Sequence, residues 1–397
     1  MKKIVISLLI LCMILSSAFV AIGTKESLNN EIADDFDSRI ENLMRHGHMP
    51  SLVTCIVKNN TLVWAKGYGY ADRSILHKRK ATPDTVYPIA SITKSITATA
   101  IMQLNETGLI GLDDNVSEYL TFDLKNPKYP DVNITFRMLL AHQSSLADTT
   151  VRFLMIFTIL KIPHDRLNEY FLPGKSLYSP RVWNDYAPGE DVCYSTMGTE
   201  ILGCLVEQIT HQSFEDYCQE HIFEPLKMRN TSFYFSDFDK DKLACLYLWM
   251  AGVYLPMPYV ESSYLAGGGL KTTISDLSHF LIMHTDSGIY DGVRILKEKS
   301  VEEMHRAQYP DSYDEGYNHG FGWYLKNFSD GETYGGHGGI YSGARAIMRM
   351  RYSDNVGVLY FWNQNSFLLT HFNHTRPEQK EARIGIEKAL FEKADEL

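Results

Sequence analysis

The 397-residue sequence predicts an α+β fold in which strands from both ends of the chain form one sheet and a mostly helical region lies between them. Near the beginning, two strand-like segments are joined by an Asn-Asn turn in "SLVTCIVKNNTLVWAKGYGYAD". From about residue 91 to residue 250 the apolar residues follow helical periodicity, interrupted by loops such as "YFLPGKSLYSP" and "YAPGEDV". Near the C-terminus three more strand-like segments follow, "FGWYL", "GARAIMRMR" and "VGVLYFWN".

Four helices are expected around these strands. Residues 31–46 precede the first strand, and a second helix begins at Ser91 and reaches about Thr107, where Gly108 ends it. The segment "AGGGLKTTISDLSHFLIMH" reads as a turn leading into a third helix, and "EARIGIEKALFEKADEL" as a C-terminal amphipathic helix. We therefore expect one domain over residues 31–397, with a sheet region at 31–90 and 265–397 and a helical region at 91–264.

The composition supports a globular protein and argues against a nucleic-acid partner. Apolar residues make up 45% of the chain, which is enough for a substantial core. The formal net charge is −10, and no Lys/Arg cluster suggests the basic face that nucleic acid requires. The sequence leaves the oligomeric state open.

The N-terminal segment "MKKIVISLLILCMILSSAFVAIG" has the pattern of a signal peptide, with two lysines, an apolar run and small residues suited to cleavage after Gly23. The run from Ile4 to Gly23 is also about 20 residues long, so an uncleaved membrane anchor stays open. In both cases we expect the rest of the chain to be exported. The last four residues, "ADEL", resemble an ER-retention signal, which would apply only in a eukaryote.

The sequence predicts no metal site and no cofactor. It contains no C-x-x-C pair, and outside the N-terminal segment it has an odd number of cysteines, five, so at least one thiol lacks a partner within the chain. "DFDKDK" begins like a calcium loop, but Lys242 stands at the position of the required glycine and Leu248 at that of the closing glutamate. "HGH", from His46 to His48, has no further ligands nearby.

A serine and a lysine three residues apart, Ser91 and Lys94 in "PIASITKSITATAIMQL", form a candidate nucleophile and proton acceptor. On a helix, residues i and i+3 share a face with β-carbons about 5 to 6 Å apart, so the amine can reach the hydroxyl. A serine hydroxyl becomes a useful nucleophile when a neighbouring base takes its proton. This spacing arises by chance about once or twice in a chain of this length, so the pair needs further support.

Two further segments supply that support. In "PGEDVCYSTMGTEILGCLVEQI", Tyr194 precedes a helical run, and a neighbouring cation favours the phenolate form that acts as a general base. In "YGGHGGIYSGARAIM", His337 lies between glycines at the entry to a strand, where a substrate can approach the backbone. The N–H of Ile340 is expected to form an oxyanion hole with the N–H of Ser91. Taken singly, Tyr194 also fits a core tyrosine and His337 a loop histidine.

With these blocks the sequence resembles the serine β-lactamase and penicillin-binding protein superfamily, on the side of class C β-lactamases, D-aminopeptidases and their esterase relatives. The matching segments follow the family's order between about residues 31 and 370: "TVYPIASITKSITATAIMQLNETGLIGLDDNVSEYL", "ITFRMLLAHQSSL", "YAPGEDVCYSTMGTEILG", "IFEPLKMRNTSF", "AGGGLKTTISDL", "HGFGWYL" and "GGHGGIYSGARAIM". The resemblance implies an antiparallel sheet, a helical region and a site between them. It also implies Ser91 as the acylated nucleophile, Lys94 as its activator and Tyr194 as the general base.

Three positions depart from the family's pattern. The third block reads His337-Gly338-Gly339 where Lys-Thr-Gly or His-x-Gly is usual. A histidine is only partly charged near pH 7, so we expect it to hold a substrate carboxylate less firmly than a lysine. Thr196 stands where the family usually has Asn, and its hydroxyl offers fewer contacts to a substrate amide. Ser145 replaces the usual glycine in "HQSSL".

The sequence therefore predicts an exported serine hydrolase that acts on a small ester or peptide amide, with His337 as a further catalytic residue and with Thr196, Gly338, Gly339 and Ile340 in contact with substrate. Two alternatives stay open: a D-amino-acid peptidase or weak β-lactamase, and a non-catalytic binding relative. Two apolar stretches, "VRFLMIFTILKI" and "LACLYLWMAGVYLPMPYV", are too short to cross a bilayer and read as core or as a membrane-touching surface. If one of them lined the cleft, apolar acyl groups would be preferred.

Overall fold

The computed structural model describes residues 35–148, 166–262, 264–309, 317–327, 331–365 and 376–397. The N-terminal segment 1–23 and the apolar stretch 151–162 therefore lie outside the described residues. Within the described residues, no helix is both long enough and apolar enough to cross a membrane. The five cysteines there form no disulfide with one another.

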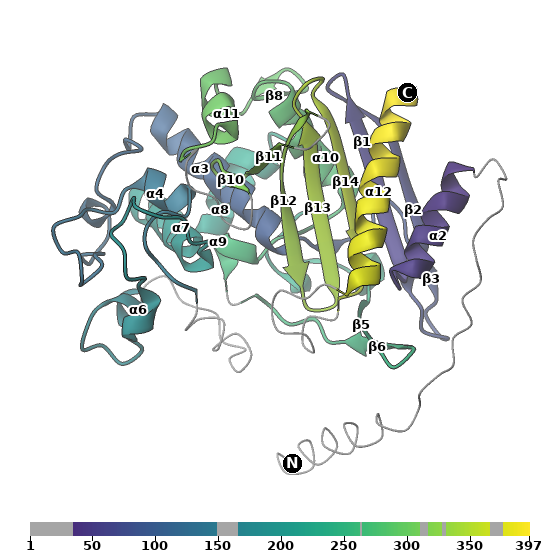
Figure 1. Ribbon diagram of the computed structural model, residues 1–397, viewed down its shortest axis with the longest axis horizontal. Coiled ribbons are helices and arrows are strands. Elements are labelled where there is room, and N and C mark those ends of the chain that lie inside the picture. Colours follow the sequence, from purple (N-terminus) through teal and green to yellow (C-terminus); the bar gives the residue numbers. More distant parts are fainter. Residues whose placement is uncertain (1–34, 149–165, 263, 310–316, 328–330, 366–375) are drawn as a thin grey trace, which may run out of the picture.

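An antiparallel sheet of eight strands forms the centre of the molecule and joins the two ends of the chain (Figure 1). Its strand order is β10-β11-β12-β13-β14-β1-β2-β3. The strands span β1 Ser51–Lys58, β2 Thr61–Asp72, β3 Arg79–Lys80, β10 Asn318–His319, β11 Tyr324–Asn327, β12 Thr333–Tyr341, β13 Ala344–Arg351 and β14 Val356–Trp362. The central pairing joins β1 to β14, with Cys55 opposite Leu359. The predicted α+β fold with an antiparallel sheet is confirmed.

The β1–β2 hairpin follows directly from its turn residues. Asn59 and Asn60 both have positive φ angles, 51° and 55°, which is the backbone conformation that tight two-residue hairpin turns require. Asparagine tolerates this left-handed conformation better than most residues with a side chain. The β1 strand then runs buried for seven of its eight residues, because helices cover both faces of the sheet there.

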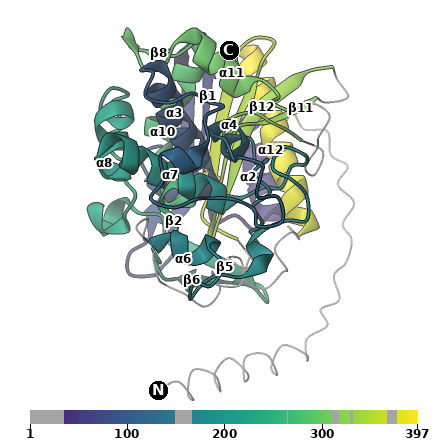
Figure 2. The same cartoon turned by 90° about the vertical axis from the view of Figure 1, so that its left-hand side faces the viewer.

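Two terminal helices cover one face of the sheet and the remaining helices lie on the other side (Figures 1 and 2). Helix α2, Phe36–His46, packs beside α12, Pro377–Glu396, and a cluster that includes Ile40, Ile386 and Trp362 fills the space beneath them. On the opposite face α10, Ile274–Thr285, contacts β1 and β14 and contributes Phe280 and Leu281 to the larger core. Both terminal helices were predicted from the sequence.

In its described residues, 91–148 and 166–262, the region between the two parts of the sheet is less helical than its periodicity predicted. The α-helices in this region and at its end are α3 Thr93–Glu106, α4 Phe136–Leu140, α6 Asn168–Phe171, α7 Thr196–Thr210, α8 Phe214–Cys218 and α9 Leu265–Gly268. One π-helical turn, η6, spans Gln219–Phe223. The 3₁₀ turns are η2 Ala90–Ile92, η3 Val116–Glu118, η5 Pro180–Val182, η7 Phe235–Asp237 and η8 Lys240–Lys242. Short strand pairs also occur: β4 Tyr87–Pro88 with β7 Lys271–Thr272, and β8 Ile289–Tyr290 with β9 Val293–Arg294. Helix α11, Glu298–His305, precedes the C-terminal strands.

The apolar stretch 243–260 folds as a hairpin and not as a helix. Strands β5, Leu246–Met250, and β6, Val253–Met257, pair around a turn at Ala251 and Gly252, both of which have positive φ angles. Aromatic and β-branched residues favour strands, and a two-residue turn with glycine closes a hairpin, so the local signal for this structure was present. The helical periodicity of the surrounding segment therefore predicted the wrong secondary structure here, whereas the turn residues favour the hairpin.

Candidate active site

Ser91 and Lys94 lie at the junction of η2 and α3, close to the sheet. The Lys94 side chain is 2% exposed, and its Nζ donates hydrogen bonds to Ser91 Oγ at 3.3 Å and to the carbonyl of Gly267 at 2.5 Å. Ser91 is half-buried, so its hydroxyl is open on one side. The spacing of three residues thus places the amine against the hydroxyl, as the sequence predicted.

Glu200 fixes the position of the Gly267 carbonyl, which accepts a hydrogen bond from Lys94 Nζ. This glutamate lies on α7 and is fully buried, and its carboxylate accepts the backbone N–H groups of Leu265 and Gly267, each at 3.0 Å. The two bonds fix the short helix α9, which presents the Gly267 carbonyl to Lys94. Sequence reasoning missed Glu200, although a single carboxylate in the apolar helix "MGTEILGCLV" was a usable signal.

Tyr194 lies in the loop before α7, with Lys94 Nζ 5.0 Å from the centre of its ring. His142 holds this loop on both sides of the tyrosine. Its carbonyl accepts the N–H of Cys193 at 2.9 Å, its Nδ1 accepts the N–H of Ser195 at 3.3 Å, and its ring lies 4.5 Å from the tyrosine ring. Burial, with the nearby His319 and Lys94, lowers the pKa of His142 well below its usual value, so the ring is neutral, and the Ser195 N–H donor fixes Nδ1 as its acceptor nitrogen. Sequence reasoning missed His142.

Asp148 caps the start of α7 immediately after Tyr194. Its carboxylate accepts the Ser195 hydroxyl at 3.1 Å and the N–H groups of Thr196 and Met197 at 2.7 and 3.3 Å. A carboxylate at a helix N-terminus satisfies backbone N–H groups that have no partner within the helix. This contact fixes Thr196, whose methyl group lies against Gly267, beside the Lys94 contact. Asp148 was also missed, because the sequence does not tell which helix a loop carboxylate will reach.

The second wall of the site is strand β12, which carries His337 in its interior and not at its entry as predicted. The ring is 2% exposed, and its Nδ1 donates to the carbonyl of Gly338 at 2.7 Å. Burial, together with the Lys94 cation, lowers the pKa of His337 to about 3. The expectation of a partly charged histidine is therefore wrong: the imidazole is neutral at pH 7, and its Nε2 carries a lone pair.

Glycines let β12 approach the nucleophile. A β-carbon on Gly339 would lie 1.8 Å from the carbonyl oxygen of Ile89, so only glycine allows this contact between β12 and the segment before Ser91. Ile340 follows with a side chain that is 46% exposed. One more ring borders Tyr194 and His337: the Tyr324 ring centre lies 6.0 Å from that of Tyr194 and 4.6 Å from that of His337. The structure thus brings Ser91, Lys94, Tyr194 and His337 together.

Ser145 adopts a backbone conformation that explains the glycine expected there. Its φ angle is 56°, in the left-handed region that glycine enters without strain. The side chain is buried and its hydroxyl accepts a hydrogen bond from Asn126 at 3.0 Å, which offsets part of the cost of that conformation. The substitution therefore changes a loop behind the site and not the groups around Ser91.

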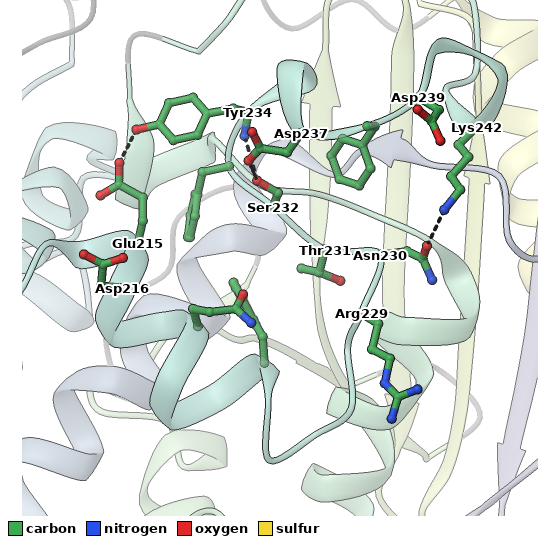
Figure 3. Close-up of a pocket in the computed structure, with 14 residues that line it drawn as sticks. Glu215, Asp216, Arg229, Asn230, Thr231, Ser232, Tyr234, Asp237, Asp239 and Lys242 are labelled. Atoms are coloured by element: carbon green, nitrogen blue, oxygen red, sulfur yellow. Dashed lines mark hydrogen bonds between the residues drawn. The ribbon is translucent and has the colours of Figure 1, made fainter.

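A separate polar pocket of about 600 Å³ lies between α8 and η8, and its lining includes none of Ser91, Lys94, Tyr194 and His337 (Figure 3). Its polar groups hydrogen-bond one another: Tyr234 to Glu215, Ser232 to Asp237, and Lys242 to Asn230. Because these groups already have partners, the arrangement around Ser91 remains the candidate active site.

Similarity to known proteins agrees with this geometry. A model of the Beta-lactamase family matches residues 36–376. Protein flp of Staphylococcus aureus (strain MW2) is 34% identical over 209 residues, which cover 52% of this chain and 39% of flp, so the chain spans about two fifths of that relative. PbpX of Bacillus subtilis (strain 168) is 29% identical over 323 residues, which cover 80% of this chain and 72% of PbpX.

Two solved structures share the fold. The octameric penicillin-binding protein homologue from Pyrococcus abyssi superimposes with a TM-score of 0.70 at 28% identity, over 83% of this chain and 73% of its own. The D-amino acid amidase from Ochrobactrum anthropi SV3 gives a TM-score of 0.72 at 21% identity, over 90% of this chain and 99% of its own, a likeness of fold alone. Since the family match covers most of the chain and the neighbours share its sheet and helices, the chain belongs to the Beta-lactamase family, whose members have the serine β-lactamase and penicillin-binding protein hydrolase fold.

Proposed function

We propose that this chain is a serine hydrolase that forms an acyl-enzyme on Ser91 and acts on a small neutral ester or amide. The observation that carries the proposal is the bond of 3.3 Å between Lys94 Nζ and Ser91 Oγ, with the Tyr194 ring 5.0 Å from the same nitrogen. A serine hydroxyl hydrogen-bonded to an amine that itself lies beside a phenol ring has a candidate route for its proton, and a neighbouring base of this kind activates a serine nucleophile.

The proposed reaction has two halves. Ser91 Oγ attacks the substrate carbonyl carbon while its proton passes to the Lys94–Tyr194 pair, and the resulting oxyanion is stabilised by the N–H groups of Ser91 and Ile340. When the bond to the alcohol or amine breaks, the leaving group takes the proton from that pair. Water then attacks the acyl carbon and gives one proton to the same pair. When the bond between that carbon and Ser91 Oγ breaks, Oγ takes this proton back from the pair, and the acid is released.

The neutral state of His337 supports a neutral substrate. With its Nδ1–H bound to Gly338, the ring offers only a lone pair at Nε2, which accepts an N–H or O–H but repels a carboxylate. A lysine in this block would hold a carboxylate, as the family's usual pattern does. We therefore expect esters and small amides to be better substrates than carboxylate-bearing β-lactams.

A D-amino-acid amide or peptide is the second candidate substrate class. Its support is the fold shared with the D-amino acid amidase from Ochrobactrum anthropi SV3. Export of the chain remains a prediction from residues 1–23, which lie outside the described residues.

The test is intact-mass analysis after incubation with a panel of activated esters, D-amino-acid amides and β-lactams. The wild-type protein should gain one acyl group, and Ser91→Ala should gain none and fall to background activity, because the variant lacks the atom that is acylated. An adduct on Ser91→Ala, or turnover at the wild-type rate, would overturn the assignment. A wild-type protein that binds panel members without any adduct would support the non-catalytic relative.

A further inference from the structure

The loop between β2 and β3 exposes two large apolar side chains among basic ones. Ile75 is 97% exposed and Leu76 is 86% exposed, and the exposed side chains of Arg73, Lys78 and Lys80 flank them. Lys78, Arg79 and Lys80 are consecutive in the sequence, a short basic run that is compatible with the expectation of no nucleic-acid-binding face. In a chain with a net charge of −10, positive charge is concentrated here around an apolar tip.

The β5–β6 hairpin continues the same surface. Between Lys242 and Glu261 the chain contains no charged residue, although Val253 is 51% exposed and Leu255 is 36% exposed. Exposed strands usually carry charged side chains, which keep them from sticking to other molecules. An uncharged, solvent-facing hairpin therefore indicates that something covers it.

Contacts between the loop and the hairpin make them one surface. The guanidinium of Arg73 lies 4.6 Å from the ring centre of Tyr254, and the backbone N–H of Arg73 donates to the Tyr247 hydroxyl at 2.8 Å. A pocket of about 520 Å³ lies between the two segments and is lined by Arg73, Trp249, Val253 and Tyr254. We call Arg73, Ile75, Leu76, Lys78, Val253 and Leu255 the apolar-basic surface.

We propose that the apolar-basic surface docks on a phospholipid bilayer that contains anionic headgroups. Apolar tips enter the boundary between headgroups and acyl chains, and flanking arginine and lysine side chains meet the anionic headgroups. Trp249 and Tyr254 on the hairpin are of the residue types enriched at that boundary. The acidic neighbour Asp72 is engaged within the protein, since its carboxylate accepts the Ser74 N–H at 2.7 Å and the Tyr247 hydroxyl at 3.4 Å.

A bilayer fits this surface better than a second copy of the chain. In a two-fold symmetric dimer the same patch faces itself, which would bring the Arg73 and Lys78 side chains of one copy towards those of the other. Like charges facing each other oppose association, whereas an anionic membrane attracts them. A membrane anchor at residues 4–23, if it is retained, would hold the domain at the same bilayer.

Hydrogen exchange of the full chain on vesicles tests the proposal independently of any anchor. The comparison is between phosphatidylcholine vesicles and vesicles with about one third phosphatidylglycerol. On the anionic vesicles, amides of residues 73–78 and 251–256 should exchange at least about tenfold more slowly, and high salt should restore their exchange. An anchor alone would attach the chain to both kinds of vesicle without this difference.

Three variants sharpen the test. The double variant Ile75→Ser with Leu76→Ser removes the apolar tip. The double variant Arg73→Glu with Lys78→Glu reverses two charges, each of which contributes about fivefold to affinity for the anionic vesicles. Each double variant should abolish the slowing of hydrogen exchange at residues 251–256. Val293→Ser is the matched control, because Val293 is 44% exposed beside Arg294 on β9, which pairs with β8, and β8 lies at the other end of the molecule from the β5–β6 hairpin (Figure 1). Equal slowing on neutral vesicles, slowing that survives the charge reversal, or slowing without vesicles that grows with protein concentration would overturn the proposal.

Discussion

Two buried lysines, Lys94 on α3 and Lys271 on β7, show how differently one molecule uses the same side chain. Lys94 is 2% exposed and Lys271 is fully buried, and each donates a hydrogen bond of 2.5 Å to a backbone carbonyl, of Gly267 and of Phe233 respectively. Lys271 also forms an ion pair with Glu261, whose Oε2 lies 2.5 Å from its Nζ. Among the described residues no carboxylate pairs with Lys94; its amine instead contacts the Ser91 hydroxyl and lies beside the Tyr194 ring.

The difference shows what separates a structural cation from a candidate catalytic one. Burial lowers the pKa of Lys271, and the carboxylate of Glu261 opposes that shift. The charge of Lys271 is therefore balanced by an acidic partner, which fits a structural role. Lys94 instead faces the Ser91 hydroxyl and the ring of Tyr194. Sequence alone presents both as a lysine next to serine or threonine residues, in "SITK" and "LKTT".

Replacing each lysine in turn by methionine should give the largest difference in kcat/KM between two variants. Lys94→Met keeps the volume but removes the group that we propose accepts the Ser91 proton, so kcat/KM should fall by about 10⁴-fold or more. Lys271→Met should change kcat/KM little, although it leaves Glu261 without its partner and lowers the urea midpoint of unfolding. Ester turnover and urea titration of both variants measure this.

The double variant Ser91→Ala with Lys94→Met tests whether the two residues act as one unit. Its activity should be little lower than that of either single variant, because removing one member already disables the pair. If losing Lys271 reduced acylation as much as losing Lys94, the division of roles between the two lysines would be wrong.

His337, whose imidazole is neutral, gives a second comparison with Lys94 within the candidate site. His337→Ala should lower kcat/KM by about 10²- to 10³-fold, the loss typical of one polar contact to the reacting group. Because the pKa of His337 is about 3, no inflection from this residue should appear in kcat/KM between pH 5 and pH 8. An inflection near pH 6.5 that disappears in His337→Ala would instead mean that the imidazole is partly charged.

The same lowered pKa determines how stability depends on pH. The unfolded imidazole has a pKa of about 6.5, so between that value and about 3 the unfolded chain binds a proton that the folded chain does not. The neutral ring's contribution to stability is therefore complete above pH 6.5 and is lost as the pH falls. Acid unfolding of His337→Ala should accordingly show a weaker dependence on pH than that of the wild type.

Glu261→Gln should have the smallest effect. Glutamine keeps the Oε1 that accepts the Phe235 N–H at 2.7 Å but removes the charge opposite Lys271. Glu261 is 44% exposed at its side chain, so solvent screens the pair, and we expect a loss of about 1 to 2 kcal/mol in the free energy of unfolding. Chemical denaturation measures this, and a drop in ester turnover at unchanged folding would contradict a purely structural role for Lys271.

Local patterns predicted much of the fold. The Asn59-Asn60 turn, the strands of the C-terminal half and the terminal helix all depend on residues within a few positions of one another, and the structure contains them. The β5–β6 hairpin was misassigned because a short apolar run suits a helix or a strand about equally until its turn is read. The resemblance to a known family, carried by the blocks around Ser91, Tyr194 and His337, agrees with the match over residues 36–376.

The sequence by itself determined the chemical groups of the candidate site and the local elements that carry them, since a serine three residues before a lysine on one helix must share its face. Only the tertiary structure decided how those groups are held and charged. His142, Asp148 and Glu200 act on segments 47 to 67 residues away in the chain, and His337 is neutral because strands and loops from several regions exclude water from it. Desolvation and contacts between distant segments depend on how the whole chain packs, and no short pattern encodes them.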